Sequence, residues 1–396
     1  MPKQPSTRNA RQRLLIRNFG PIRDADIRLT DLTVVVGPQA TGKSIFLQTL
    51  KLVQDRNQIH QVFARYNVVF NGDSAGFFGG YYGKGMRAAW RDDSGLTWGK
   101  RALDLSDFSR PAPRGNKTEK VFLIPAQRVM SLAGGVTQNF GQFNYGDPYA
   151  LRYFSDVVHD LVQNEFGAKG DLFPQPNRLN AVLRKPIEAH LFAGSRLGID
   201  DSDFTKKLVI KIPGHDTGLP YTAWSAGQRE FTPLLLGIYW LCPSGGISRR
   251  ASIETVIIEE PEMGLHPQAI VTVLLLILEL LRRQYRVVVS THSTTVLDLV
   301  WTLREFQTLQ ATADDVRALF DLNRGVAAKA LASAALQKRY SAYFFDRDGC
   351  AKNISGLDPG AENQAEALWG GLAGFSARTG EILARVVNRH QSQVDG

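Results

Sequence analysis

The chain has 396 residues, of which 43% are hydrophobic and 21% charged, a composition typical of a soluble globular protein. This length is enough for two or three folded units with a large core. The net charge of +9 favours an anionic partner such as nucleic acid. The two cysteines, Cys242 and Cys350, have neither metal-binding nor redox spacing, so we expect a reduced, cytoplasmic setting.

The N-terminal residues 1–12 are polar and basic and lack the apolar segment of a secretion signal, so we expect a disordered basic arm. No apolar run reaches the length of a bilayer span. The longest, residues 269–281, contains Thr272 and Glu279, which predicts a buried amphipathic helix. We therefore expect no association with a membrane.

Short apolar runs at residues 13–18, 24–29 and 32–36 predict three strands. The third is followed by a glycine-rich turn of the form G-x-x-x-x-G-K-S, and residues 44–53 then have the apolar spacing of a helix. The turn consists of Gly37, Pro38, Gln39, Ala40, Thr41, Gly42, Lys43 and Ser44. A strand, this turn and a helix in succession identify a phosphate-binding loop.

In such a loop, backbone N–H groups and the helix N-terminus point at the phosphates of the ligand. Lys43 is expected to reach the β- and γ-phosphates, and the Ser44 hydroxyl to ligate Mg²⁺. The sequence therefore predicts that all eight residues of the turn line a site for a nucleoside triphosphate.

Residues 56–110 are irregular and rich in glycine and aromatic residues, including the run from Phe77 to Tyr82. We expect a β-subdomain with glycine-rich turns, and the stacking of these aromatic rings on bases is the alternative. Residues 88–90 and 96–98 flank a polar turn at residues 92–95, which predicts a hairpin.

Further along, residues 121–125 predict a second buried strand that ends just before Gln127. Residues 151–166 and 179–192 have helical spacing, and residues 208–212 return to a strand pattern. The expected organisation is a basic arm at 1–12, a first lobe at 13–130, a helical insert at 131–202, a second lobe at 203–345 and a helical tail at 346–396.

Three polar clusters follow in the second lobe. Ser225, Gly227 and Gln228 open an apolar helix, and such a helix N-terminus can bind an anion. Glu259 and Glu260 end a strand predicted at residues 255–260, where one carboxylate can hold Mg²⁺ and the next can activate water. His292 follows a strand predicted at residues 286–290, which places its imidazole near the γ-phosphate.

In this order the motifs resemble the ABC-type ATPase heads of the RecF, SMC and OLD group, from residue 13 to about residue 345. The resemblance implies an α/β P-loop fold with a mixed sheet, an antiparallel β-subdomain and a helical insert. It implies ATP and Mg²⁺ as ligands, residues 37–44 as Walker A, residues 225–228 as the signature, and residues 261–267 as the D-loop.

The same resemblance implies three catalytic residues, Glu260, His292 and Gln127, and three Mg²⁺ ligands, Ser44, Gln127 and Glu259. Two positions depart from the usual pattern. Ala226 stands where transporter ATPases usually have glycine, and Glu259 stands where Walker B more often has aspartate. Gln127 also lies unusually far along the chain from Lys43.

Heads of this kind form head-to-head dimers, so we expect a homodimer or a higher oligomer of dimers, with a nuclease or toxin as effector partner. ATP hydrolysis coupled to nucleic acid or to that partner, in anti-phage defence, is the first hypothesis. The alternatives are a RecF-like DNA repair ATPase and a slowly hydrolysing scaffold that holds a toxin or nuclease. A transporter subunit is disfavoured because the signature is not of the transporter type.

Residues 346–349, Asp-Arg-Asp-Gly, resemble a metal-binding nuclease motif. No acidic strand precedes them, so the sequence predicts a turn after the strand at residues 342–345. Residues 363–387 predict helices without catalytic residues.

Overall fold

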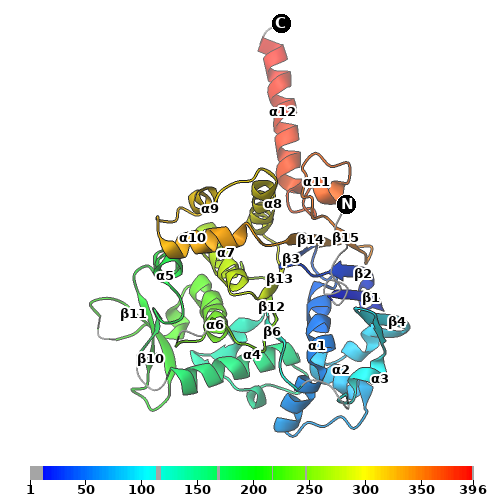
Figure 1. The fold of residues 1–396 in the computed structure, drawn as a ribbon, viewed down its shortest axis with the longest axis vertical. Helices are drawn as coiled ribbons and strands as arrows, with labels where there is room; N and C mark the ends of the chain where they lie inside the picture. The colour runs from blue at the N-terminus through cyan, green and yellow to red at the C-terminus, as the bar shows by residue number, and fades with distance from the viewer. Residues whose placement is uncertain (1–11, 113–116, 167–169, 216, 246–247, 395–396) are drawn as a thin grey trace.

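A six-stranded sheet forms the centre of the computed structural model, which describes residues 12–112, 117–166, 170–215, 217–245 and 248–394 (Figure 1). The strand order is β15-β14-β3-β13-β12-β6; β14 to β6 run parallel, and β15 is antiparallel at the edge. The strands are β3 (Leu32–Val36), β6 (Val121–Ile124), β12 (Thr255–Glu259), β13 (Arg286–Ser290), β14 (Tyr340–Phe345) and β15 (Ala351–Asn353).

Each face of this sheet is covered by its own hydrophobic core, because successive residues of a strand point to opposite faces. Val34 and Val36 belong to one core and Val35 to the other. The first core packs under α4 (Tyr149–Asp160), α6 (Ala226–Leu241), α7 (Pro267–Arg282), α8 (Thr294–Thr308) and α10 (Val326–Ala335). The second packs against α1 (Lys43–Arg65), α2 (Ser74–Tyr82) and a separate antiparallel sheet.

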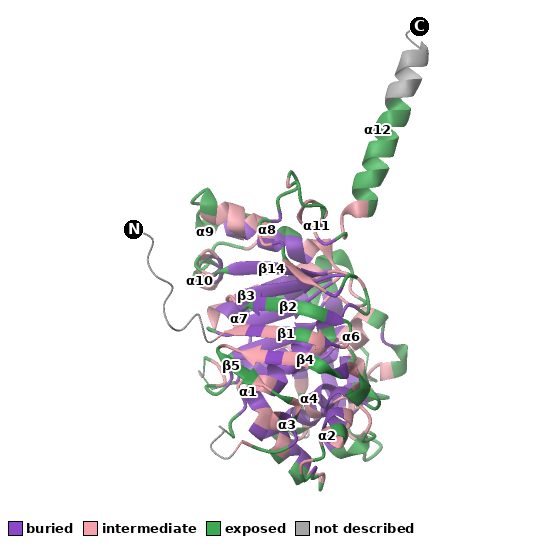
Figure 2. Ribbon diagram, turned by 90° about the vertical axis from the view of Figure 1, so that its right-hand side faces the viewer, coloured by how far each residue is buried: buried purple, intermediate pink, exposed green. Residues whose placement is uncertain are grey.

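That antiparallel sheet has the order β2-β1-β4-β5, and its strands are labelled in Figure 2. The strands are β1 (Arg13–Phe19), β2 (Ile22–Arg28), β4 (Trp90–Trp98) and β5 (Arg101–Leu103). The predicted strands in this region are therefore confirmed, but the hairpin prediction was misplaced. Residues 92–95 lie within β4, where the pairing with β1 shifts register, and the chain turns instead at Gly99 (φ 63°).

The aromatic run at residues 77–82 is helical, which corrects the β-subdomain predicted there. Its aromatic residues recur at positions i, i+1, i+4 and i+5, so they share one face of α2. Asp73 caps this helix by accepting a hydrogen bond from the Gly76 N–H. All four rings are buried in the second core, so stacking on bases is excluded in this structure.

The insert expected to be helical at residues 131–202 contains a sheet as well. Besides α4 and α5 (Ala181–Ile187), it includes β7 (Leu132–Ala133), β8 (Val136–Thr137), β9 (Asp171–Phe173) and β10 (Arg196–Asp200). β9 and β10 join β11 (Lys207–Lys211) in a three-stranded antiparallel sheet. Alternating residues Leu197 and Ile199 bury in the first core, a strand pattern too short to recognise in the sequence.

The remaining helices are short, except for the last one. They are α3 (Leu105–Phe108), α9 (Ala313–Leu319) and α11 (Gln364–Ala367), while α12 (Gly374–Val394) projects from the body (Figures 1 and 2). Short 3₁₀ turns lie at Met86–Ala89, Arg128–Ser131, Phe140–Gln142 and Tyr221–Ala223, and π turns at Leu161–Glu165 and Glu188–Phe192.

Two predictions about particular segments are confirmed. Residues 346–349 form the turn between β14 and β15, and residues 269–281 lie in the buried helix α7. None of the helices in the described part of the chain is long and apolar enough to cross a membrane. The basic arm predicted for residues 1–12 falls outside the described residues except for Gln12, and the predicted helical tail also contains β15.

Candidate nucleotide-binding site

The phosphate loop lies between β3 and α1, as the sequence predicted. Gly37 and Gly42 have φ of 147° and 97°, conformations that side chains rarely adopt. A Cβ atom on Gly42 would lie 2.5 Å from the Ile22 side chain, and one on Gly37 would collide with the Phe345 carbonyl. Both glycines are therefore required by the close packing of the loop against β14 and the β1–β2 turn.

Lys43, the first residue of α1, is buried against this loop. Its Nζ donates hydrogen bonds to the carbonyl oxygens of Gly37 and Pro38, both at 2.7 Å. Burial lowers the pKa of Lys43, and the charge of Glu260 partly opposes this effect. The ammonium group thus has two neutral acceptors and no ion pair with any described residue, which leaves its charge available to an anion.

A pocket of about 390 Å³ opens beside the loop and brings the ends of three strands together. Most of its lining consists of residues 39–45, and Glu260 and His292 close it from the ends of β12 and β13. The His292 Nε2 lies 3.5 Å from Glu260 Oε1, and each side chain is 32% exposed. The structure therefore brings together the phosphate loop and two of the three predicted catalytic residues.

Glu260 has a backbone conformation that is uncommon for a side-chain-bearing residue, with φ of 44°. Its N–H donates to the Ser290 carbonyl at 2.9 Å, and its carbonyl accepts from Arg128 Nη2 at 3.1 Å. Such strain costs about 1–3 kcal/mol and occurs most often at functional sites. These two hydrogen bonds fix the turn that directs the carboxylate towards the pocket.

Glu259 is buried at the end of β12, with 1% of its surface exposed. Its Oε2 accepts a hydrogen bond from the Ala126 N–H at 3.2 Å, and the nearby Ser44 hydroxyl lowers the pKa of the carboxyl group. Burial raises the pKa of Glu259 to about 7, and Oε1 has no hydrogen-bond partner among the described residues. An unpartnered carboxylate oxygen beside a hydroxyl is a donor set that fits Mg²⁺.

Gln127 follows β6 and precedes the 3₁₀ turn at Arg128–Ser131. Its side chain is exposed and does not line the phosphate-loop pocket. The N–H of the preceding residue, Ala126, donates to Glu259. Gln127 therefore follows a residue that contacts this carboxylate, but no hydrogen bond joins its own side chain to Glu259. Its roles as Mg²⁺ ligand and catalytic residue stay predictions.

The signature residues are at the N-terminus of α6 and do not line the pocket of their own chain. Ser225 and Gln228 form a capping box: Ser225 Oγ accepts from the Gln228 N–H at 3.2 Å, and Gln228 Oε1 from the Ser225 N–H at 3.0 Å. A Cβ on Gly227 would lie 3.2 Å from the Gly264 carbonyl. Each residue therefore has a structural role within the chain, whatever it binds.

Sequence reasoning missed Arg128, whose side chain is fully buried. Its guanidinium donates to the carbonyl oxygens of Glu259 at 2.9 Å and Glu230 at 3.1 Å, in addition to Glu260. Arg128 thus connects the end of β6, the two glutamates and the signature helix. No sequence signal points to this role, because an arginine after a strand is usually exposed.

Glu262 holds the loop that carries His292. Its Oε1 accepts hydrogen bonds from Thr291 Oγ1 at 2.8 Å and from the His292 N–H at 2.6 Å. The sequence placed Glu262 only within the D-loop, and its contact with the end of β13 depends on the folded sheet.

One family model matches part of the chain. Residues 129–298 match a family model described as "AAA domain, putative AbiEii toxin, Type IV TA system". This segment contains the signature, both glutamates and His292, and the phosphate loop precedes it. The comparison with curated proteins found no match.

Solved structures with similarity to the chain include ABC cassettes and SMC heads. A bacterial ABC transporter cassette in dimeric form is 11% identical over 72% of this chain and 89% of its own, with a TM-score of 0.32. The SMC head domain from Thermotoga maritima is 16% identical over 72% and 90%, with a TM-score of 0.30. An SMC head bound to the C-winged helix domain of ScpA is 12% identical over 86% and 96%, with a TM-score of 0.37.

Proposed function

We propose that the protein is an ATPase that binds Mg²⁺-ATP at the phosphate loop and hydrolyses it in a head-to-head dimer. The observation that carries this proposal is the convergence of Lys43, Glu260 and His292 on one pocket at the carboxyl ends of three parallel strands. Phosphoryl transfer to water needs a cation for the phosphates, a base for the water and a further polar group near the γ-phosphate. Lys43, Glu260 and His292 around the phosphate loop can supply these groups.

In this mechanism the loop N–H groups and Lys43 bind the β- and γ-phosphates, and Lys43 exchanges its two carbonyl partners for phosphate oxygens. Glu260 orients the attacking water and accepts its proton, and His292 donates to the γ-phosphate or to the carboxylate. Ser44, Glu259 and, by resemblance, Gln127 would hold Mg²⁺, which neutralises developing phosphate charge. Glu260→Gln should retain ATP and slow hydrolysis by roughly 10²- to 10⁴-fold.

The second half of the site is proposed to come from another subunit. The start of α6 offers N–H donors and the positive end of a helix dipole, yet it lies outside the pocket of its own chain. A two-fold dimer is the symmetric arrangement in which each signature can reach the other subunit's γ-phosphate. ATP would then hold the dimer closed, and hydrolysis would open it.

Two substitutions of Ser225 separate this role from helix capping. Aspartate and asparagine both cap helices well, so each should preserve α6. Only aspartate adds a negative charge where the partner's γ-phosphate is expected. In a Glu260→Gln background with Mg²⁺-ATP, we expect Ser225→Asn to retain the dimer and Ser225→Asp to abolish it, as measured by light scattering.

Mixed subunits give a second measure. Lys43→Met and Ser225→Asp subunits should each be inactive alone, whereas their mixture should recover activity from the one intact site of each heterodimer. If Ser225→Asp hydrolyses ATP normally as a monomer, the dimeric mechanism is wrong.

We further propose that this cycle controls a toxin or nuclease partner in anti-phage defence. The description of the matching family model, which names a toxin and a toxin–antitoxin system, supports this setting. A RecF-like role in DNA repair is the alternative. The test expresses the product of a neighbouring gene, alone and together with this chain. Growth arrest that this chain relieves, but that its Lys43→Met variant does not relieve, would favour the effector partner over repair.

A further inference from the structure

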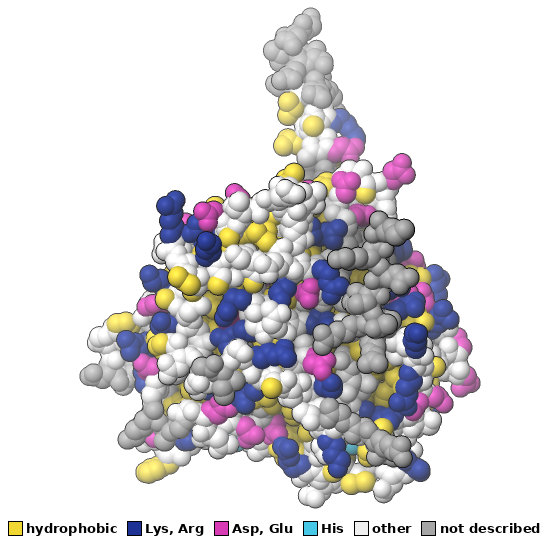
Figure 3. Space-filling model, in the orientation of Figure 1, with side chains coloured by type: hydrophobic (Ala, Val, Ile, Leu, Met, Phe, Trp, Pro, Cys, Tyr) yellow, Lys and Arg dark blue, Asp and Glu magenta, His cyan; other side chains and the backbone are white. Residues whose placement is uncertain are grey.

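A second pocket lies at the opposite end of the strands that carry the nucleotide site. It has a volume of about 510 Å³ and forms where β3, β12, β13 and β14 begin. Lys and Arg side chains gather on this face of the molecule (Figure 3). Four cationic side chains, Arg249, Arg286, Lys338 and Arg339, and two acidic ones line the pocket.

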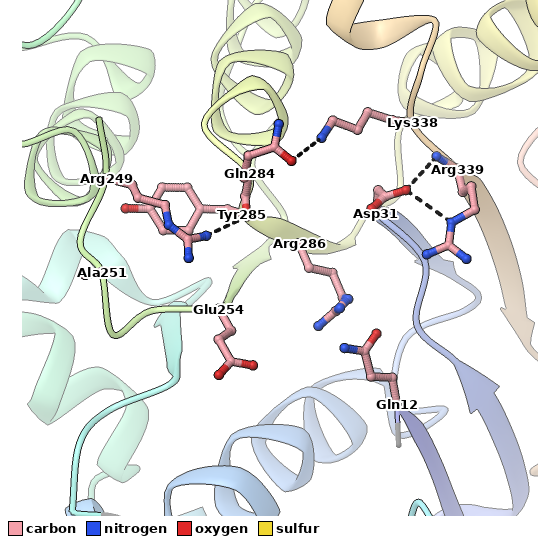
Figure 4. Close-up of a pocket in the computed structure, with 10 residues that line it drawn as sticks. All are labelled: Gln12, Asp31, Arg249, Ala251, Glu254, Gln284, Tyr285, Arg286, Lys338 and Arg339. Carbon is pink, nitrogen blue, oxygen red and sulfur yellow. Dashed lines mark hydrogen bonds and ion pairs between the residues drawn. The ribbon is translucent and has the colours of Figure 1, made fainter. Parts of the chain in front are cut away.

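Two of these cations are positioned by one residue, Gln284. Lys338 Nζ donates to the Gln284 side-chain oxygen at 3.2 Å, and Arg249 Nη1 donates to its backbone carbonyl at 2.7 Å (Figure 4). Gln284 has a positive φ of 67° because it closes the C-terminus of α7, where its N–H donates to the Leu281 carbonyl. Neither Arg249 nor Lys338 forms an ion pair with a described residue, so both charges remain available to a ligand.

Arg249 packs against a buried aromatic ring, and Lys338 is partly buried. Arg249 lies over the ring of Tyr285, 5.7 Å from its centroid, and Tyr285 is itself buried with its hydroxyl bonded to the Leu241 carbonyl. Burial lowers the pKa of Lys338, while Asp31 opposes this effect. Partial burial of a cation without a paired carboxylate is unfavourable, and an anionic ligand would relieve it.

The acidic side chains restrict which anion fits. Asp31 forms an ion pair with Arg339 at 3.3 Å (Figure 4), and Glu254 forms one with Lys120 at 2.5 Å. Carboxylates beside cations repel a bare polyphosphate but accept hydrogen bonds from ribose hydroxyls, as in dinucleotide sites. The volume is also within the usual range for small-molecule pockets.

We propose that this pocket binds a nucleotide, with its phosphates on Arg249 and Lys338 and its ribose hydroxyls on Asp31 or Glu254. The same chemistry could come from a free nucleotide or from the 5′-phosphorylated end of an RNA strand, whose first ribose keeps its 2′-hydroxyl. This site goes beyond the proposed ATPase, because it shares none of the residues that line the phosphate-loop pocket.

The test uses the full-length Lys43→Met variant, in which the phosphate-loop site is disabled. Isothermal titration with ADP, pyrophosphate and a short single-stranded RNA, with and without a 5′-phosphate, reports binding at the second pocket. We expect ADP or the phosphorylated oligonucleotide to bind at one site per chain. Adding Arg249→Gln and Lys338→Gln should weaken binding by about tenfold to 100-fold, because two charge-assisted contacts are lost.

Lys84→Gln removes the same kind of charge from an exposed position outside the pocket and should leave binding unchanged. Thermal melting checks that each variant folds, and Lys338→Gln alone serves if the double substitution does not. Binding of ADP assigns the site to a free nucleotide, and binding of only the phosphorylated oligonucleotide assigns it to a strand end.

The proposal is overturned if neither probe binds, or if pyrophosphate binds as tightly as ADP. It is also overturned if binding survives the loss of Arg249 and Lys338. That last result would place the ligand elsewhere on the chain and would leave the proposed ATPase untouched, so the two proposals fail in different ways.

Discussion

Two buried lysines on the same helix, Lys43 and Lys51, have opposite surroundings. Lys51 is fully buried and paired with Asp55 at 3.0 Å and Glu119 at 2.8 Å. These carboxylates outweigh the cost of burial and raise the pKa of Lys51. Lys43 has only carbonyl partners, and burial lowers its pKa.

The difference separates a cation with a structural role from one that we propose to bind a ligand. The charge of Lys51 is already compensated, and its network joins α1 to β6 through the Val121 carbonyl. The charge of Lys43 is not compensated within the described chain, so an anionic ligand gains more from meeting it. Burial alone would not distinguish these two residues; the charge of their partners does.

Removing the structural cation should have the largest effect on stability. Lys51→Met leaves Asp55 and Glu119 buried without their counter-charge, which typically costs about 3–5 kcal/mol. We expect a clear fall in the thermal denaturation midpoint. Lys352→Met, which breaks a half-buried ion pair with Asp346, is the control and should cost about 1 kcal/mol. Equal effects of the two substitutions would contradict the comparison.

Removing the binding cation should affect ATP and leave the fold intact. Lys43→Met should lower ATP affinity by about 100-fold or more, roughly 3 kcal/mol, because the β- and γ-phosphates lose their main counter-charge. Its thermal midpoint without ligand should stay close to that of the wild type. ATP affinity like that of the wild type, measured by titration calorimetry, would refute the phosphate-loop assignment.

The smallest expected effect is a pH dependence at Glu259. Its pKa of about 7 is above the ordinary value of 4.5, so the folded state holds the extra proton between these values. Stability without Mg²⁺ should therefore fall as pH rises through this window, by about 1–3 kcal/mol. Glu259→Gln should remove this pH-dependent contribution of Glu259 to the free energy of unfolding. The difference in stability between wild type and variant should therefore vary with pH across this window.

Mg²⁺ offers a complementary measurement, since it needs the ionised carboxylate. We expect Mg²⁺ with ATP to stabilise the wild type more at pH 8 than at pH 6, and this pH dependence to disappear in Glu259→Gln. A stability difference that does not vary with pH would show that Glu259 is ionised throughout.

Local sequence signals were sufficient to predict the central strands, the phosphate loop and the two residues, Glu260 and His292, that close the pocket beside this loop. These signals are β-branched runs of about five residues, glycines at fixed spacing and polar residues just after a strand. Because parallel strands end at one edge of a sheet, the order of the motifs along the chain already implies that Glu260 and His292 lie near Lys43.

Other features depend on contacts between distant segments, which no local pattern encodes. The helix at Ser74–Tyr82 forms although its glycines have low helix propensity. Burial of its four aromatic rings on one face stabilises it by more than the glycines cost. The roles of Arg128 and Lys51 depend on partners about 70 to 130 residues away in the chain. The pocket at the amino ends of the strands likewise joins residues from several segments, and these meet only when the sheet has formed.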